Sequence, residues 1–274
     1  MKLVRDILPK ATAFLKGKDI PQAKRTAEEL LAHLLGCKRL DVYMQFDTPL
    51  KEDELETYRG YLRRASQNEP YEYITGYIWF GGVKITVTKD VLIPRPETEL
   101  ILTHIQKKAV VPRKILDMCT GSGCLAIALK KMYPEAEVFA ADISKAALDV
   151  ARANARANGV DVTFIESDMF SSVEEGNFDI IVSNPPYITE KEYEGLQLSV
   201  KEYEPKIALV GGADGLKYYR ELQSNLSKLS AIGLLAFEIG TGQGGDLFEI
   251  FKGGEVEKDW ASHDRFFFLD QSKQ

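Results

Sequence analysis

The sequence predicts a protein of the α/β class: a doubly wound, mostly parallel sheet preceded by a small domain made only of helices. Apolar residues recur at helical spacing through roughly the first seventy residues. From Lys114 onward, short apolar runs typical of buried strands alternate with helical segments, which is the pattern of a parallel sheet covered by helices. A glycine-rich turn, Gly121-Ser122-Gly123, follows the first of these strands.

The composition limits the possible classes of protein. With 274 residues, 45% hydrophobic and 28% charged, the chain has the size for two domains and the balance of a soluble globular protein. It contains no apolar run of the roughly 18 residues that span a bilayer, and no secretory signal is visible. Three cysteines and three histidines lack the spacing of metal ligands, so we expect no metal and a cytoplasmic location. A net charge of -6 favours a protein or small-molecule substrate over nucleic acid.

Three helices are predicted in the N-terminal region. Apolar spacing defines the first between Leu3 and Leu15 and the second between Ala23 and Leu35, with Gly36 as its end. The third begins near Leu50 with acidic residues and ends with arginines before Pro70, a polarity that suits the helix dipole. This region has no glycine turn or acid cluster, so it is either a binding module or a bundle that only packs.

A hairpin is predicted next. Ile78-Trp79-Phe80, the pair Gly81-Gly82 and the alternating run from Val83 to Thr88 are typical of two short strands and a turn. We expect this hairpin to link the two domains. Pro96 and the acids that follow it then indicate the start of another helix.

Strands and helices alternate in the rest of the chain. The predicted strands are Ile115–Met118, Val138–Ala141, Val162–Ile165, Phe178–Val182, Leu234–Ile239 and Phe266–Leu269. The predicted helices are Leu125–Met132, a segment capped by Ser144 that runs to Asn158, and Leu216–Leu229. Parallel sheets bind ligands at the carboxyl ends of their strands, near the point where the strand order reverses. The residues that follow the strands are therefore the candidate site.

The turn Cys119-Thr120-Gly121-Ser122-Gly123 is a candidate for binding a cofactor. Glycines let the backbone approach a ligand closely, and the helix that follows aims N–H groups at it. Asp142 ends the second strand about 20 residues downstream, where an acid would hold ribose hydroxyls. With Ala126 the turn also fits Gly-x-Gly-x-x-Ala, so this region alone leaves NAD, S-adenosylmethionine and a turn without any ligand open.

The motif Asn184-Pro185-Pro186-Tyr187 follows a buried strand and is the candidate for chemistry. Pro185 favours an extended Asn184, and neither proline has an N–H to compete for local hydrogen bonds. The Asn184 side-chain oxygen and the Pro185 carbonyl could each accept one N–H of a substrate amide or amino group and so align its nitrogen for methyl transfer. Tyr187 could stack on the flat group. A dehydrogenase has no need of this arrangement, whereas a proline-rich turn that only ends a strand remains the alternative.

Asp168 is a candidate for recognising adenine. It follows the third strand and could accept a hydrogen bond from the adenine amino group, while Met169 or Phe170 packs on the ring. The alternative is a solvated acid in a loop.

Together these motifs resemble the release-factor glutamine methyltransferases, the HemK/PrmC family. Methyltransferases that act on adenine share the Asn-Pro-Pro-Tyr type of motif but lack two of the other segments, Ile93–Glu99 and the group from Glu204 to Leu216. The pieces that carry the resemblance are Pro70–Gly76, Leu92–Glu99, Thr120–Gly123, Asn184–Tyr187, Glu204-Pro205, Ala208-Leu209 and Gly212–Leu216.

The resemblance implies a class I S-adenosylmethionine-dependent, Rossmann-like methyltransferase domain at residues 91–274. A hairpin linker at 73–90 would join it to a helical domain at 1–72 that recognises the release factor. The implied reaction, in translation termination, methylates the side-chain amide of the glutamine in the Gly-Gly-Gln loop of class 1 peptide-chain release factors and leaves S-adenosylhomocysteine. The implied protein is a cytoplasmic monomer without direct contact with nucleic acid or membrane. The rivals are the paralogous enzyme for a ribosomal-protein glutamine, an adenine amino methyltransferase, a dinucleotide-dependent oxidoreductase and a catalytically silent binding module.

Carried over residue by residue, the resemblance also implies the site. Cys119 to Gly123 would contact the cofactor, Asp142 its ribose and Met169 its adenine, with Asp168 and Asn184 completing the set. Asn184 to Tyr187 would hold the glutamine, and the predicted catalytic residues are Asn184, Pro185 and Tyr187.

Two positions depart from the family pattern. Cys119 stands where the family usually has glycine, and we expect its side chain to require ordinary backbone angles and to crowd the methionine end of the cofactor. Met169 stands where an aromatic residue is common, and it offers a flexible but still apolar platform.

Overall fold

The computed structural model describes residues 2–108, 111–173, 176–229 and 231–271. They form two compact units: Met1–Gly76 with Gln197–Tyr203, and Tyr77–Leu196 with Glu204–Gln274. The segment 197–203 joins the first unit, where the Tyr203 hydroxyl donates to the Gln67 carbonyl at 2.9 Å. Both strands of the predicted hairpin linker belong to the second unit.

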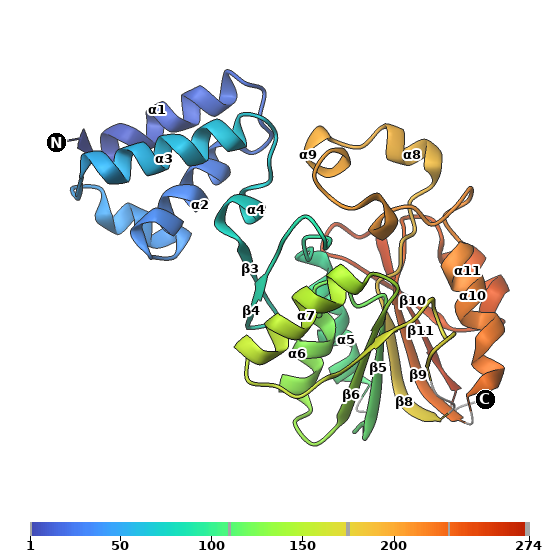
Figure 1. Cartoon of the computed structure of the whole chain (residues 1–274). Coiled ribbons are helices and arrows are strands. Elements are labelled where there is room, and N and C mark those ends of the chain that lie inside the picture. The colour runs from blue at the N-terminus through green and yellow to red at the C-terminus, as the bar shows by residue number, and fades with distance from the viewer. Residues whose placement is uncertain (1, 109–110, 174–175, 230, 272–274) are drawn as a thin grey trace. The chain divides into compact units, whose positions relative to one another are not determined.

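The first unit is helical, and its three predicted helices are confirmed (Figure 1). Gly36 ends the second of them with φ of 65°, a left-handed conformation that favours glycine. Buried apolar side chains from all three helices form one core, in which the Tyr58 hydroxyl donates to the Ala27 carbonyl at 2.9 Å. The elements are β1 (Lys2–Leu3), α1 (Val4–Lys16), α2 (Ala23–Leu35), the 3-10 helix η1 (Arg39–Gln45), β2 (Pro49–Leu50), α3 (Glu52–Ala65), α4 (Tyr71–Thr75) and α9 (Leu198–Lys201).

A seven-stranded sheet forms the centre of the second unit. Its strands in spatial order are β10 (Glu255–Lys258), β11 (Asp264–Asp270), β9 (Ala231–Glu238), β8 (Asn177–Ser183), β5 (Lys114–Met118), β6 (Glu137–Asp142) and β7 (Thr163–Glu166). The pairs β6/β7, β5/β6, β5/β8 and β8/β9 are parallel, and only the β11 pairings are antiparallel among the described strands of this sheet. The predicted doubly wound, mostly parallel sheet is therefore confirmed, with its reversal of strand order between β5 and β8.

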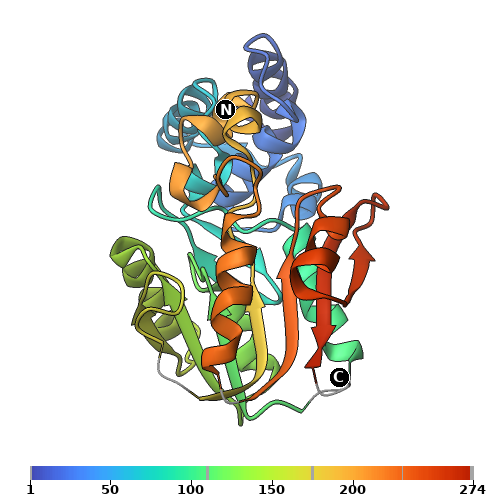
Figure 2. The ribbon, with the colours of Figure 1, turned by 90° about the vertical axis from the view of Figure 1, so that its right-hand side faces the viewer.

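Helices cover both faces of this sheet. Figure 1 shows α5 (Leu100–Lys107), α6 (Cys124–Met132) and α7 (Lys145–Ala157) on one face, and Figure 2 looks toward the face covered by α10 (Lys217–Asn225) and α11 (Gly244–Phe251). The alternation of side chains along β11 fits both layers, because Phe266 and Phe268 contact His104 of α5 whereas Phe267 contacts Phe251 of α11. The shorter helical pieces are η2 (Glu97–Glu99), α8 (Glu190–Glu194), η3 (Lys206–Ala208) and η4 (Leu226–Lys228).

The hairpin consists of β3 (Tyr77–Phe80) and β4 (Val83–Thr86), and the buried Asn154 side chain binds it to helix α7. The Asn154 amide on α7 accepts from the Thr86 N–H at 2.8 Å and donates to the Thr86 carbonyl at 2.9 Å. Its nitrogen also donates to the Ser122 carbonyl at 3.0 Å. One asparagine thus joins the hairpin, helix α7 and the glycine turn.

Two findings bear on classes of protein that the sequence disfavoured. Among the described residues, no helix is both long and apolar enough to cross a membrane. Over the same part of the chain, no group of three or more His, Cys, Asp or Glu side chains is placed to hold a metal ion.

Candidate active site

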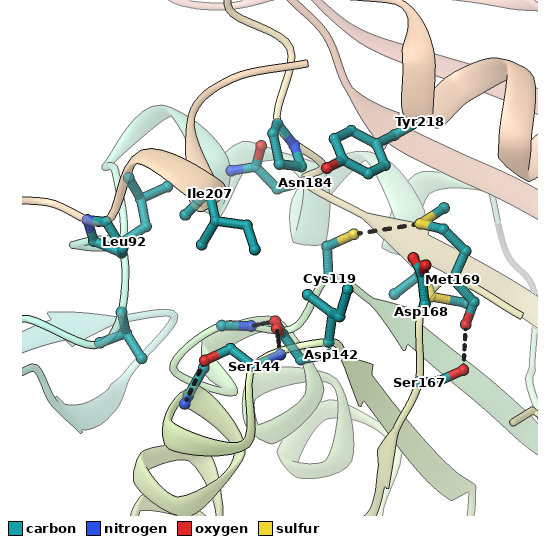
Figure 3. Close-up of a pocket in the computed structure, with 18 of the residues that line it drawn as sticks. Leu92, Cys119, Asp142, Ser144, Ser167, Asp168, Met169, Asn184, Ile207 and Tyr218 are labelled. Carbon is teal, nitrogen blue, oxygen red and sulfur yellow. Dashed lines mark hydrogen bonds between the residues drawn. The ribbon is translucent and has the colours of Figure 1, made fainter. Parts of the chain in front are cut away.

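A cavity lies at the carboxyl ends of β5, β6, β7 and β8, where the strand order reverses. Figure 3 shows Asn184 and Tyr218 on one side of it and Asp142 and Ser144 on the opposite side. The lining residues at or just after the ends of these four strands are Met118, Cys119, Gly121, Asp142, Ile143, Ser144, Ser167, Asp168, Met169, Asn184 and Pro186. The remaining wall comes from Asp90–Leu92, Ala147, Pro205, Ile207, Ala208 and Tyr218.

The glycine turn takes the shape that its residues predict. Gly121 and Gly123 have φ of 56° and 80°, in the left-handed region that glycine enters without cost. A Cβ on Gly123 would lie 3.0 Å from the Ala151 Cβ, so this glycine also allows α7 to pack close to the turn. Of the predicted cofactor residues in the turn, Cys119 and Gly121 line the cavity whereas Thr120, Ser122 and Gly123 do not.

The expectation of ordinary backbone angles at Cys119 is wrong. Its φ is 60°, and a residue with a side chain pays about 1–2 kcal/mol for this conformation. Met169, which also lines the cavity, has a left-handed backbone too, with φ of 48°. Its sulfur atom lies 4.0 Å from the sulfur atom of Cys119. Burial raises the pKa of the Cys119 thiol far above its ordinary value, so the group is an uncharged, apolar part of the wall.

Asp117 holds the glycine turn from beneath. This fully buried side chain accepts from the Thr120 hydroxyl at 2.6 Å and from the Ala126 N–H at 3.1 Å, both through one oxygen. Its other oxygen has no hydrogen-bond partner among the described residues. Burial raises the pKa of Asp117 to about 7. Thr120 therefore serves the turn rather than the cavity.

Asp142 presents its carboxylate at the end of β6. One oxygen accepts from the Gly121 N–H at 2.8 Å, and the other accepts from the Ser144 N–H at 2.8 Å. Burial raises the pKa of Asp142, and these two N–H groups oppose that effect. The Ser144 hydroxyl in turn caps α7, accepting from the Ala147 N–H at 3.2 Å as the sequence predicted.

The wall beside Asp142 combines apolar and acidic side chains. Met169 and Asp168 line it, whereas Phe170 is buried in the core and does not reach the cavity. The Ser167 hydroxyl donates to the Met169 carbonyl at 2.6 Å, which fixes this turn. Ile143 was not predicted as a site residue although it directly follows Asp142; its apolar side chain is half exposed and lines the cavity.

At the end of β8 the four residues of the Asn-Pro-Pro-Tyr motif diverge. Asn184 and Pro186 line the cavity, and Pro185 and Tyr187 do not. The Tyr187 ring packs against the core and its hydroxyl donates to a Glu238 oxygen at 3.1 Å, so stacking on a substrate stays a prediction. The aromatic side chain that does line the cavity is Tyr218, which the sequence analysis missed.

The backbone of this motif rests on a glycine loop. A Cβ on Gly211 would lie 2.4 Å from the Pro186 carbonyl oxygen, and a Cβ on Gly215 would lie 2.2 Å from that of Tyr187. Gln243 joins the two segments, because its amide nitrogen donates to the Tyr187 and Gly215 carbonyls at 3.2 and 3.3 Å. Only glycine permits this close approach, which explains physically why Gly211 and Gly215 stand in this loop.

An ion pair between the buried Glu204 and the partly exposed Arg95 joins two segments of the cavity wall. The Glu204 carboxylate accepts from the Arg95 guanidinium at 2.6 Å and from the Ile93 N–H at 3.1 Å. It thereby ties together the two segments that contribute Leu92 and Pro205 to the wall.

The strand order and the cavity at the reversal point, together with the known proteins that match, identify a class I S-adenosylmethionine-dependent methyltransferase. Residues 96–199 match the methyltransferase small domain, and residues 6–76 match the PrmC N-terminal domain. Solved structures share the fold: T. thermophilus 16S rRNA methyltransferase RsmC (TM-score 0.51, 20% identity, 71% of this chain and 49% of that one) and the hMettl16 catalytic domain (0.53, 14%, 80% and 82%).

The chain belongs to the release factor glutamine methyltransferase family. It is 39% identical to the release factor glutamine methyltransferase of Geobacter sulfurreducens, over 90% of this chain and 88% of the relative. It is 42% identical to that of Chlorobaculum tepidum, over 86% and 85%. The family resemblance that the motifs predicted is thereby confirmed.

Proposed function

We propose that this protein uses S-adenosyl-L-methionine to methylate the side-chain amide nitrogen of the glutamine in the Gly-Gly-Gln loop of class 1 peptide-chain release factors. One observation carries the proposal: a single cavity presents the Asp142 carboxylate on one side and the Asn184 amide on the other. The first suits a ribose and the second suits a planar amide. The relatives named for release factor glutamine supply the identity of that amide.

The residues on the Asp142 side fit the cofactor. Each carboxylate oxygen uses one lone pair on a backbone N–H and keeps another for a ribose hydroxyl. Ile143 and Met169 offer apolar contact for a flat ring, and the exposed carboxylate of Asp168 can accept from an adenine amino group. When bound, the cofactor would supply the methyl group, and the left-handed backbone at Cys119, Gly121 and Gly123 would let the turn approach it closely.

The residues on the Asn184 side fit a glutamine amide. An amide nitrogen is a poor nucleophile because its lone pair is delocalised into the carbonyl. Two acceptors, the Asn184 side-chain oxygen and the Pro185 carbonyl, would each hold one N–H and favour the pyramidal nitrogen of the transition state. Fixing the nitrogen in line with the transferred group supplies much of the remaining rate enhancement.

We further propose the division of labour along the chain. Residues 1–72 recognise the release factor, 73–90 link, and 91–274 carry the chemistry. The helical unit exposes Leu40 and Met44, which are 67% and 87% accessible, and Leu40 lies beside the cations Lys24 and Arg39, a combination suited to a protein surface. The enzyme would act as a cytoplasmic monomer without binding nucleic acid, in line with its net charge of -6.

Transfer of a labelled methyl group to a purified release factor tests the proposal. We expect labelling of the wild-type release factor and none when its loop glutamine is changed to alanine. Parallel reactions with ribosomal protein and with an adenine-containing oligonucleotide represent the two rival substrates, and we expect neither to be labelled. Equal labelling of the wild-type release factor and its glutamine-to-alanine variant would contradict the assignment. So would preferential labelling of the ribosomal protein or the oligonucleotide.

A further inference from the structure

Behind Asn184 lies a buried chain of hydrogen bonds that joins three distant parts of the sequence. The Asn184 amide nitrogen donates to the Thr98 hydroxyl oxygen at 3.3 Å, and the Thr98 hydroxyl donates to one Glu238 oxygen at 2.5 Å. The second Glu238 oxygen accepts from the Tyr187 hydroxyl at 3.1 Å. Thr98 and Glu238 are 1% and 2% exposed, so no solvent competes for these bonds.

The direction of these bonds is set by chemistry. Burial raises the pKa of the Glu238 carboxyl, and the Thr98 and Tyr187 hydroxyls, which donate to its two oxygens, oppose that effect. The ionised carboxylate that they stabilise can only accept hydrogen bonds. The Thr98 hydroxyl has a single proton, and it donates this proton in its hydrogen bond to Glu238. The Thr98 oxygen therefore faces Asn184 with lone pairs alone, and only the nitrogen of the Asn184 amide can bond to it.

The opposite orientation of the Asn184 amide is disfavoured. It would set the amide oxygen against the Thr98 lone pairs, which repel it, and leave the Thr98 oxygen without a donor. In the observed orientation the Asn184 oxygen has no hydrogen-bond partner among the residues that the structure describes. That oxygen is the acceptor that a substrate N–H requires.

We propose that Glu238 and Thr98 are positioning residues, which hold the Asn184 amide in the one orientation that offers its oxygen to the substrate. The inference rests on the proposed function, since it assigns these residues a task in binding an amide N–H. Neither side chain lines the cavity, so both act through Asn184. Tyr187 supports the same network by occupying the second Glu238 oxygen.

Two substitutions abolish the fixed order of donors and acceptors between Asn184 and Glu238, and each changes the shape of its side chain little. Glu238→Gln replaces one of the two acceptor oxygens by an N–H donor. With this donor opposite Thr98, the Thr98 proton is free to bind the Asn184 oxygen. Thr98→Val removes the hydroxyl altogether. In both we expect kcat to fall by about 10²-fold, the scale for a misplaced reacting group, whereas the Kd for S-adenosylhomocysteine stays within about twofold of wild type.

Thr98→Ser is the conservative variant, because serine keeps the hydroxyl, and we expect it to recover most of the lost turnover. Asp179→Asn is the matched control for the carboxylate-to-amide change. Asp179 accepts from the backbone N–H groups of Arg113 and Lys114 near the amino-terminal ends of β8 and β5, away from the cavity at the carboxyl ends, so kcat should remain near wild type. Thermal unfolding of each preparation shows which variants are folded, and Thr98→Val and Glu238→Gln carry the test independently of each other.

The outcomes separate the two proposals. Absence of release-factor labelling by the wild type would overturn the proposed function and this inference with it. Normal wild-type labelling with undiminished kcat in both folded variants would overturn the positioning role alone. A parallel loss of kcat and cofactor affinity, or failure of Thr98→Ser to restore turnover, would also overturn it, since either result indicates a general structural role.

Discussion

The two sides of the cavity are built by different means. On the cofactor side, Asp142 is held by the N–H groups of Gly121 and Ser144, so the whole arrangement lies within one short stretch of chain. On the substrate side, Asn184 depends on Thr98 and, through it, on Glu238, which lies 140 residues from Thr98 in sequence. The Asp142 arrangement needs only the consecutive elements from β5 to the start of α7, whereas the Asn184 arrangement exists only when Thr98 and the ends of β8 and β9 have come together. Substitutions should therefore separate into effects on cofactor affinity and effects on turnover.

The largest effect is expected at Asn184. Asn184→Ala removes the side-chain acceptor and should lower kcat by at least about 10²-fold, the size found when one preorganised polar contact is lost in a transition state. Cofactor affinity should stay near wild type. Single-turnover methylation and calorimetric titration with S-adenosylhomocysteine measure the two quantities. A collapse of affinity would instead make Asn184 a cofactor residue and remove the contrast between the two sides.

Asp142→Ala should show the reverse pattern. Loss of the charged acceptor for ribose hydroxyls should raise the cofactor Kd by about 10²-fold, since hydrogen bonds to a charged group contribute about 1.5–3 kcal/mol. At saturating cofactor, kcat should remain within a few-fold of wild type. Asp168→Ala provides the comparison: a single bond to adenine predicts a smaller rise of about tenfold. Unchanged affinity in Asp142→Ala would contradict the assignment of this side to the cofactor.

Gly215→Ala tests the support of the substrate side by backbone contact. Its φ of 74° is costly for alanine, and the new Cβ would lie 2.2 Å from the Tyr187 carbonyl oxygen, so the motif must move. Gly82 has φ of 81° with nothing within 4 Å of the added Cβ, which makes Gly82→Ala the matched control. Both variants should lose about 1–3 kcal/mol of unfolding free energy from the backbone angle. Only Gly215→Ala should also lower kcat, by about tenfold or more.

The raised pKa of Asp117, beneath the glycine turn, should make the free energy of unfolding depend on pH. Its pKa is raised to about 7 in the folded protein, above the ordinary value near 3.9, so the folded state binds this proton more tightly. The resulting stabilisation is fully present below about pH 4 and is lost as pH rises through about 7. Relative to Asp117→Asn, the wild-type free energy of unfolding should fall by up to a few kcal/mol over this range. Parallel curves from denaturant titrations at several pH values would contradict the shift.

Cys119 offers the smallest expected effect. Cys119→Gly relieves the strain of a left-handed φ of 60°. Cys124→Gly is the control, because it removes the same side chain from the first residue of α6, where φ is not positive. The first substitution should cost about 1 kcal/mol less unfolding free energy than the second. Equal losses in thermal or chemical unfolding would show that the backbone at Cys119 relaxes at no cost.

Much of the cofactor side could be predicted from the sequence because its residues directly follow strands. Asp142, Asp168 and Met169 were predicted in this way and line the cavity. Ile143 could have been predicted too, as an apolar residue just beyond an acid at a strand end. The left-handed angle at Cys119 was missed because residue type alone argues against it. The family pattern of glycine at this position contained the signal.

The substrate side could be predicted only in part. Glu238 gives a sequence signal, since an acid inside the apolar run from Leu234 to Ile239 needs a buried partner. The partner itself, Thr98, follows from the assembled sheet and not from any local pattern. Tyr218 and Ile207 likewise reach the cavity only through tertiary packing.

The fold shows the same limit. Its long periodic segments were predicted, whereas α11 and β10 were missed because Gly244-Gly245 and Gly253-Gly254 disguise a short helix and a short strand.

The most direct test of the account is to label an extract of cells that lack this protein with the purified enzyme and a labelled methyl donor. We predict that the label enters a class 1 release factor, and that peptide mass spectrometry finds one added methyl group on the side-chain nitrogen of the Gly-Gly-Gln glutamine. Label on a ribosomal protein, on nucleic acid or on another residue of the release factor would contradict it.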